Sequence, residues 1–223
     1  RKEAEKMPVK RVSIMIVLCI WVSAVPVHGG CIDGDCSGGW GIFLMEDGGR
    51  YEGSFEETLP HGRGVFTTAT GDEYSGEFSR GEFTGGHARF TTRQGDRYEG
   101  DFRNGNMNGK GVLFLKNGDR YEGEFKDGDF NGRGTCFFAD GTVCKGEFRD
   151  GRLNGTGVYV TAEGAYEGEF SNNEPIFGTF TRGDGVVYSG PFKNGRFEGR
   201  GVVAFPDGTR IESEFRDGEP VKD

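Results

Sequence analysis

The phrase aromatic-x-Gly-x-Phe returns about every 23 residues along most of this 223-residue chain. Weaker copies begin at Cys144 and Ile211. The clear copies begin at six tyrosines: Tyr51, Tyr74, Tyr98, Tyr121, Tyr166 and Tyr188. Repetition at a fixed period of this length is typical of arrays in which each unit packs mainly on its neighbours. The spacing therefore predicts a repeat array over residues 39–218 of about eight units, with no room for a second domain of ordinary size.

Each repeat unit is predicted to contain two strands and two turns. In one unit Tyr121, Gly123 and Phe125 alternate with Glu122 and Glu124, which is the period-two pattern of a half-buried strand. The two rings share one face of the strand, and the glycine between them leaves space that a neighbouring ring could occupy. A second strand such as "VLFL" follows and ends in another turn. Hairpins laid side by side predict an all-β fold, an elongated single-layer antiparallel sheet of tandem 23-residue hairpins.

The turns between the strands carry a strong local signal. A basic residue, then Asn or Asp, then Gly is the sequence that tight hairpin turns prefer, because these residues tolerate positive φ. The predicted repeat-turn glycines are Gly105, Gly128, Gly151, Gly195 and Gly218. Two units depart from the pattern. The unit at Tyr166 ("SNNEPIFGTF") is expected to lose this turn and its Gly-x-Gly pair, and the unit at Tyr74 carries an extra residue around "GGHARF".

Aromatic residues must supply the buried surface, because hydrophobic residues make up only 34% of the chain while it contains 20 Phe and 7 Tyr. Ring stacking between units is the physical reason we infer for the repetition. The predicted repeat core, which would also be an extended aromatic binding face, consists of Tyr51, Phe55, Tyr74, Phe78, Tyr98, Phe102, Tyr121, Phe125, Phe148, Tyr166, Phe170, Tyr188, Phe192 and Phe215.

The first 30 residues differ from the array. Lys10 and Arg11 precede an apolar run over residues 12–25, and small residues follow, which is the layout of a secretory signal peptide. We therefore predict a leader over residues 1–30, cleaved after Ala24 or around Gly29–Gly30, and an exported protein, periplasmic or extracellular. An uncleaved membrane anchor and a buried core segment are the alternatives. A short cysteine-containing segment (31–38) and a tail (219–223) flank the array.

Four cysteines lie outside the predicted leader: Cys31, Cys36, Cys136 and Cys144. An even number in an exported chain favours disulfides, with three connectivities open and the two local pairs preferred. Cys136 and Cys144 face each other across a hairpin if the loop Ala139-Asp140-Gly141 has three residues, whereas a two-residue loop would place Cys136 on the opposite face. A zinc site is less well supported, because neither spacing matches the close ligand pairs of zinc sites.

The residues give little sign of catalytic chemistry. Glutamates such as Glu99 and Glu122 recur at the same slot of each unit, which indicates a solvated face rather than one active site. His61 and His87 have no neighbouring nucleophile pattern, and no G-x-G-x-x-G opens a helix. We therefore predict no enzyme, no catalytic residue, no metal and no cofactor. The formal net charge of −9 also argues against a nucleic-acid partner.

The repeat resembles the MORN repeat, the membrane occupation and recognition nexus motif. Residues 98–120 and 121–143 match its pattern almost position for position: Tyr-x-Gly-x-Phe, a basic-Asn/Asp-Gly turn, Gly-x-Gly, and aromatics before a second turn. The resemblance implies an elongated β structure used for scaffolding, protein binding or membrane association. No further domain accompanies the repeats, so the resemblance implies no kinase or methyltransferase activity.

Three functions remain open at this stage. The first is a non-catalytic scaffold that binds a protein, or itself, through the aromatic face. The second is peripheral association with membranes through the basic turn residues Arg103, Lys126, Arg149 and Lys193. The third is a carbohydrate-binding module or enzyme in which acidic and aromatic residues bind a sugar, with Tyr98 and Tyr121 as the aromatic residues to test.

Overall fold

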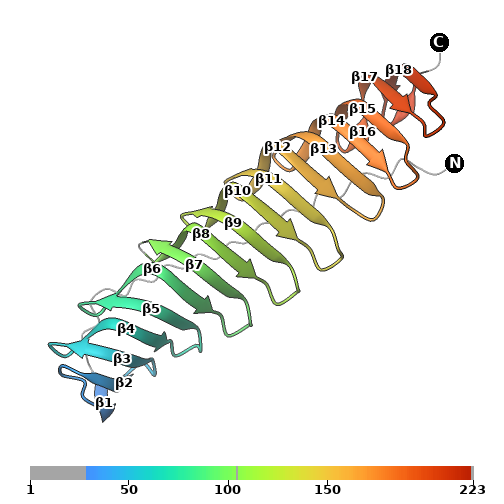
Figure 1. Cartoon of the computed structure of the whole chain (residues 1–223). Coiled ribbons are helices and arrows are strands. Elements are labelled where there is room, and N and C mark those ends of the chain that lie inside the picture. The colour runs from blue at the N-terminus through green and yellow to red at the C-terminus, as the bar shows by residue number, and fades with distance from the viewer. Residues whose placement is uncertain (1–28, 104, 222–223) are drawn as a thin grey trace. The chain divides into compact units, whose positions relative to one another are not determined.

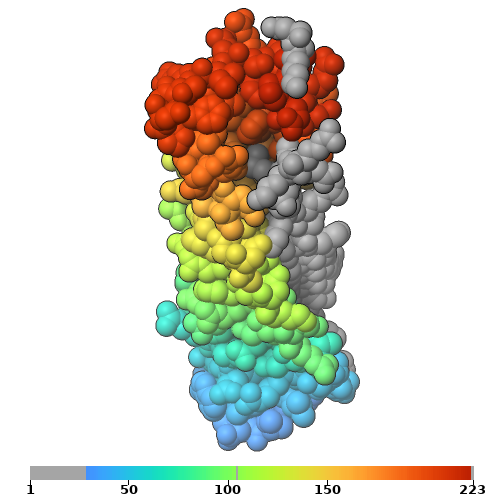
Figure 2. Space-filling view, turned by 90° about the vertical axis from the view of Figure 1, so that its right-hand side faces the viewer, coloured from blue at the N-terminus to red at the C-terminus, as the bar shows by residue number. Residues whose placement is uncertain are grey.

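The computed structural model describes residues 29–103 and 105–221, so most of the predicted leader lies outside the described residues. Every element of the described chain is a β-strand, and the contacts divide the chain into two compact units that meet in sequence at Asp129 and Phe130. Within each unit the strands follow one another in sequence order, as the colours of Figures 1 and 2 show. The predicted antiparallel hairpin repeat is confirmed.

The N-terminal unit is a sheet in which every strand pairs antiparallel with the next. Its strands are β1 (Gly29–Gly34), β2 (Trp40–Met45), β3 (Arg50–Glu56), β4 (Leu59–Thr67), β5 (Glu73–Ser79), β6 (Glu82–Thr91), β7 (Arg97–Arg103), β8 (Asn106–Phe114) and β9 (Arg120–Lys126). β1 begins inside the segment that the sequence assigns to the leader, so cleavage that keeps this strand whole must lie before Gly29.

The C-terminal unit repeats the same antiparallel order. Its strands are β10 (Asp129–Phe137), β11 (Val143–Arg149), β12 (Arg152–Val160), β13 (Gly164–Ser171), β14 (Glu174–Arg182), β15 (Val187–Lys193), β16 (Arg196–Phe197), β17 (Gly199–Ala204), β18 (Arg210–Arg216) and β19 (Glu219–Pro220). β15 pairs with both β16 and β17, and β19 uses two residues of the segment expected to be a tail.

The predicted turn glycines all have positive φ, between 73° and 92°. Asp127 and Asp150, just before two of these glycines, are also left-handed, both with φ of 51°. Two successive positive φ values define the type I′ turn, whose twist matches that of the strands it joins. The short turns therefore fix the register from one unit to the next.

The expected loss of the turn after Tyr166 is wrong. Asn172 and Asn173 have φ of 51° and 70° and form the same left-handed turn, because asparagine tolerates this region better than most residues. The Asn173 side chain also accepts a hydrogen bond of 2.7 Å from the Leu153 amide. Of the Gly-x-Gly pair only Gly178 remains, and it still pairs with Gly168.

The extra residue of the Tyr74 unit is accommodated at a bulge in β6. Gly85 and Gly86 have φ of 92° and 79°, and the register of β5 and β6 shifts on both sides of Glu77. Two consecutive left-handed glycines let the strand take up one more residue without side-chain strain.

All fourteen aromatic residues of the predicted core are buried, none more than 6% exposed. Tyr98 shows the repeated arrangement, since its ring lies 5.0 Å edge-on from Phe102 of its own unit and 5.0 Å from Phe125 of the next. Edge-to-face pairs at this separation are the favoured geometry of aromatic contacts. Tyr51, Tyr166 and Tyr188 repeat this edge-on placement between two phenylalanines, whereas Tyr74 packs mainly on Phe90, with ring centroids 4.6 Å apart.

The tyrosine also folds back over glycines. A Cβ atom at Gly111 would lie 2.4 Å from Tyr98 Oη, and one at Gly100 would lie 2.6 Å from the same oxygen. Gly100 and Gly111 lie opposite each other across the hairpin. The ring of Tyr98, two residues before Gly100 on the same strand, thus fills the space that both glycines leave.

A third buried row completes the core and was not predicted. Met107, Phe130 and Leu153 are 2%, 4% and 0% exposed. They reach the core because the strand register shifts between the repeated Gly and Phe positions, so that Phe102 lies opposite Met107 and Phe148 lies opposite Leu153. The bulge bends the second strand of each unit and turns its first residues toward the rings.

One turn is strained, and its relief should stabilise the protein. Thr58 has φ of 69°, a conformation that a β-branched residue rarely adopts, and its side chain is exposed. Thr58→Gly should raise the free energy of unfolding by about 1 kcal/mol, since glycine adopts this conformation without steric cost. The shift is measured as the urea midpoint by circular dichroism. Asn173→Gly is the control: it should destabilise, because it removes the hydrogen bond to Leu153. A lower midpoint for Thr58→Gly would contradict the assignment of strain.

Candidate functional site

The aromatic face cannot serve as a direct binding surface. Tyr98 and Tyr121 are 0% and 2% exposed, and the other rings of the repeat core are equally inaccessible. The prediction that the core rings form a binding face is therefore wrong, as is a sugar-binding site made from Tyr98 and Tyr121. The physical reason is that the rings pack on one another and on the glycine backbone of the same chain.

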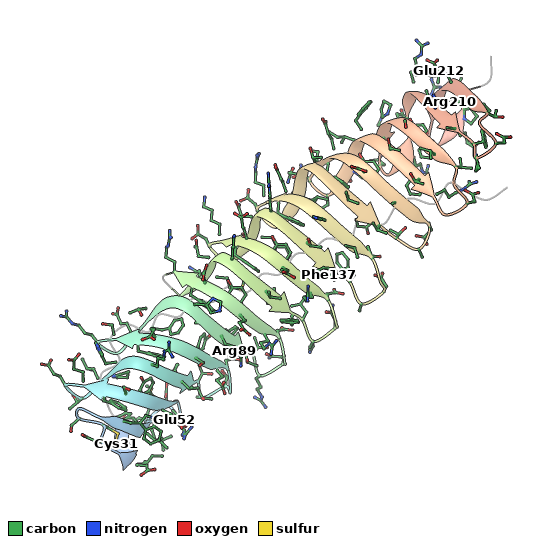
Figure 3. All side chains as sticks on the ribbon, viewed as in Figure 1. Cys31, Glu52, Arg89, Phe137, Arg210 and Glu212 are labelled. Atoms are coloured by element: carbon green, nitrogen blue, oxygen red, sulfur yellow. A yellow bond between two sulfur atoms is a disulfide. The ribbon has the colours of Figure 1, made fainter. Side chains whose placement is uncertain are left out.

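The opposite face of the N-terminal unit carries a groove of about 570 Å³. Its floor is the backbone of Gly53, Gly64 and Gly76, whose missing side chains would point toward the rings. Charged and polar side chains flank the glycines on both sides along the strands β3 to β7; those lining the groove are Glu52, Arg63, Ser75, Glu77, His87, Arg89 and Glu99. Glu52 and Arg89 are labelled in Figure 3. The groove thus crosses the strands rather than following one of them.

Ion pairs join neighbouring strands across the groove walls. Arg63 Nε lies 3.0 Å from Glu77 Oε1, and Arg89 Nη2 lies 3.2 Å from Glu99 Oε2. All four side chains are substantially exposed, so each pair contributes little to stability. Such pairs can exchange partners with an incoming ligand at low energetic cost, and they offer it charges of both signs.

Trp40 stands at one end of the groove. It is 51% exposed, although it lies on β2 opposite Ser54 of β3. Exposed tryptophan is unusual on a soluble surface and is enriched among the residues that dominate binding energy at protein interfaces. Sequence reasoning did not single out Trp40. Its one available signal was that tryptophan stands in the Gly-x-Gly slot where the next unit carries Arg63.

Both described histidines pair with carboxylates, and the described residues form no metal site. His61 pairs with Glu56 at 3.1 Å and His87 with Asp101 at 3.4 Å, both on exposed surface. No group of three or more His, Cys, Asp or Glu side chains among the described residues is placed to hold a metal ion. The described residues also include no helix suited to crossing a membrane.

The buried tyrosines have raised pKa values. Burial raises the pKa of Tyr51 to about 12, with a smaller contribution from the negative charge of Glu77. Burial likewise raises the pKa of Tyr166 to about 12, and burial also raises the pKa of Tyr98. The hydroxyl of Tyr98 donates a hydrogen bond of 2.9 Å to the Asp101 carbonyl. These phenols are structural, since they are neutral and enclosed.

Comparison with protein families identifies the repeat. The MORN repeat model matches residues 51–73, 74–85, 98–120, 121–143, 144–165, 166–175 and 188–210. The chain belongs to the MORN repeat family. MORN repeats are associated with scaffolding and with protein or membrane interactions, and the family is generally non-catalytic. The matches are short at residues 74–85 and 166–175, the two units that depart from the pattern.

Other comparisons add little to the MORN assignment. No curated protein matches the chain. Among solved structures, the TCP domain of SAS-4 (dCPAP) from Drosophila melanogaster, solved with a proline-rich motif of Ana2, is 13% identical; the match covers 70% of this chain and 85% of that one, with a TM-score of 0.43.

Two lyases are more distant still. Virginiamycin B lyase from Staphylococcus aureus is 11% identical over 84% of this chain and 73% of its own, with a TM-score of 0.18. A streptogramin B lyase is 15% identical over 84% and 58%, with a TM-score of 0.16. These scores are too low to support an argument about function.

The basic turn residues considered for membrane binding are all exposed: Arg103, Lys126, Arg149 and Lys193. In the MORN turns, however, an acidic residue directly follows two of them, Asp127 after Lys126 and Asp150 after Arg149. Adjacent opposite charges cancel at a distance comparable to the screening length of physiological salt. These turns therefore do not form a uniformly basic rim.

The cysteines differ between the two predicted pairs. Cys31 and Cys36 form a disulfide with Cα atoms 5.9 Å apart, at the start of the N-terminal unit (Cys31 is labelled in Figure 3). Cys136 and Cys144 are buried thiols, and they lie directly opposite each other in register. The second pair occupies a slot where the other MORN units carry a ring.

Proposed function

We propose that this chain is a non-catalytic, exported MORN-repeat module that binds an extended segment of a protein partner in the groove over β3 to β7. The observation that carries the proposal is the groove itself, with its glycine floor, its two charged walls and the exposed Trp40 at one end. The proposed binding surface is therefore the face opposite the buried rings, in place of the aromatic face that the sequence suggested.

An extended segment suits the groove for steric reasons. The side-chain positions of Gly53, Gly64 and Gly76 point away from the groove, toward the rings, so no side chain covers the floor and a second polypeptide can lie against it. The pairs Arg63–Glu77 and Arg89–Glu99 can bond to a partner that carries both acidic and basic side chains. Trp40 offers the apolar anchor that such interfaces usually need.

The binding proposal is tested by selecting peptides from a displayed random library on the immobilised full chain. Enriched peptides should bind Trp40→Ala at least about tenfold more weakly, as expected for the loss of an interface anchor. Arg63→Glu should also weaken the binding of these peptides, because the new carboxylate repels Glu77 and reverses the charge at this position of the groove wall.

Arg200→Glu is the matched control, since Arg200 forms the equivalent exposed pair with Glu212 at 2.8 Å in the C-terminal unit. It should leave peptide binding unchanged. Failure to enrich any peptide, or equal binding to the wild-type and Trp40→Ala chains, would refute the groove. Light scattering on the same preparation separates a partner from a second copy of this chain.

Export is supported by the leader-like pattern of residues 1–30 and by the disulfide between Cys31 and Cys36, since disulfides persist mainly in oxidising compartments. The intact mass of the native protein tests it. Cleavage after Ala24 would retain β1 whole, whereas a mass that includes residues 12–25 would show that the leader is kept.

Membrane association remains the second function that MORN repeats suggest. Flotation with vesicles containing anionic lipid at low salt distinguishes it. Because acidic residues directly follow two of the four basic turn residues, we expect no flotation. Strong flotation that is lost in Lys126→Glu would favour the membrane function over the groove.

A further inference from the structure

Two cysteines replace a ring contact in the C-terminal unit. Cys136 of β10 and Cys144 of β11 lie directly opposite each other and are 2% and 5% exposed. In other units the same position pairs an apolar residue with a tyrosine, as in Leu113 with Tyr121 or Phe66 with Tyr74. This hairpin therefore has two small side chains where its counterparts have a large aromatic contact.

The loop that joins the two strands sets this register. Phe138 N donates to the Thr142 carbonyl at 2.9 Å, Gly141 N donates to the Phe138 carbonyl at 2.9 Å, and Gly141 has φ of 87°. This is the three-residue loop that brings Cys136 and Cys144 face to face.

The register also gives a spacing that a disulfide can span. Hydrogen-bonded pairs alternate along an antiparallel hairpin, so the pair two residues from Phe138 and Thr142 is again of the hydrogen-bonded kind, with Cα atoms about 5.5 Å apart. That distance lies within the range of about 4.4–6.8 Å found between the Cα atoms of disulfide-bonded cysteines.

Nearby packing adapts to the missing ring. Leu153 is 0% exposed, and its Cδ1 lies 2.8 Å from where a Cβ of Gly146 would be. In the Tyr98 unit the phenol fills the equivalent glycine site. Leucine thus fills the space beside Gly146, and the two cysteines at the end of the hairpin stay opposite each other in the strand register.

We propose that Cys136 and Cys144 form a redox-responsive cross-strand disulfide. One thiolate attacks a sulfur of an oxidant disulfide such as oxidised glutathione and releases one glutathione thiolate. The second cysteine thiolate then attacks the protein sulfur of the mixed disulfide, which closes the Cys136–Cys144 bond and releases the second glutathione. The two thiols of the protein lose two electrons and two protons, and the oxidant disulfide becomes two thiols.

The buried pair should respond differently from Cys31 and Cys36. Cys31 is exposed, so its disulfide exchanges directly with thiols in solution. Exchange at Cys136 and Cys144 requires the β10–β11 hairpin to open first, because both thiols are buried. Once closed, the bond covalently joins the two strands where the aromatic contact is absent. This inference does not depend on the groove.

The test refolds the full chain, starting from reduced and from oxidised protein, in glutathione buffers of graded ratio. Unreacted thiols are trapped with iodoacetamide in denaturant and located by mass spectrometry of a digest. The expected product is a linked pair of peptides containing residues 136 and 144, about 2 Da lighter than the dithiol form. Its thermal midpoint should exceed that of the dithiol form by about 5–10 °C.

The double variant Cys136→Ser/Cys144→Ser is the control, since it keeps the Cys31–Cys36 disulfide. Any redox-dependent shift that remains in this variant belongs to that other pair and is subtracted. The proposal is overturned if both residues stay alkylatable after refolding with excess oxidised glutathione, or if the linked peptides join Cys136 or Cys144 to Cys31 or Cys36.

Discussion

Gly111→Ala should lower the stability of the N-terminal unit by about 3 kcal/mol, the upper end of what overpacking a core costs. A Cβ atom there would lie 2.4 Å from Tyr98 Oη and 2.5 Å from Tyr98 Cε2, far inside contact distance. The ring cannot move aside, because Phe102 and Phe125 hold it edge-on at 5.0 Å from each side. The loss is measured as a shift of the urea midpoint followed by circular dichroism.

A double variant tests whether the clash with the ring causes the loss. Tyr98→Leu alone should also destabilise, because it removes a buried ring. Gly111→Ala combined with Tyr98→Leu should cost clearly less than the sum of the two, since the smaller side chain makes room for the added methyl group. Gly38→Ala is the control, because a Cβ at Gly38 would meet nothing within 4 Å. Additive losses, or an equal loss at Gly38, would show that the tyrosine is not what excludes a side chain from Gly111.

The strands and turns could be predicted from sequence because their causes are local. The alternation of Tyr121, Gly123 and Phe125 and the turn glycines such as Gly128 specify strand and turn through neighbouring residues alone. The third core row was missed because it depends on a register shift. Met107 meets Phe102 only after the bulge between Gly100 and Phe102, and the one sequence signal for that bulge is Gly109, with φ of 74°.

The site was harder to predict than the fold. The alternation pattern identifies which residues share a face, but it does not reveal what covers that face. The rings of Tyr98 and Phe102 were therefore assigned both to the core and to a binding surface, whereas the structure makes them core alone. The groove residues Arg63 and Glu99 repeat slots that are charged in several units, so sequence alone treated them as ordinary solvated surface. In the structure, Arg63 and Glu99 differ from other charged surface residues because they line a groove with a glycine floor and Trp40 at one end.

Raising the pH should unfold the protein in a steep transition near pH 11, driven by the buried tyrosines. The pKa of Tyr51 and Tyr166 is raised to about 12, mainly by burial, and burial also raises the pKa of Tyr74, Tyr98 and Tyr188. The ordinary pKa of tyrosine, about 10, applies to the unfolded chain. A group whose pKa is higher in the folded state contributes its full stabilisation below pH 10 and loses it as the pH rises through the folded value.

The expected size of the effect follows from linkage. Between pH 10 and 12 each such tyrosine favours the unfolded chain by up to about 1.4 kcal/mol per pH unit. Tyr51, Tyr74, Tyr98 and Tyr166 together reach about 5 kcal/mol near pH 11, which is comparable to the whole stability of many domains. Phenolate absorbance at 295 nm and the β-sheet circular dichroism should therefore change together and abruptly.

Tyr166→Phe separates the contribution of ionisation from that of hydrogen bonding. At pH 7 the variant should be less stable, because the Tyr166 hydroxyl lies within hydrogen-bond distance of the Glu169 and Phe177 carbonyls, at 2.9 and 2.8 Å. Between pH 10 and 12 its stability should fall less steeply than that of the wild type, because one titrating group is gone. A gradual phenolate titration centred near pH 10 with the sheet signal intact would mean that the rings are accessible to water. That result would remove the physical basis for placing the binding site on the opposite face.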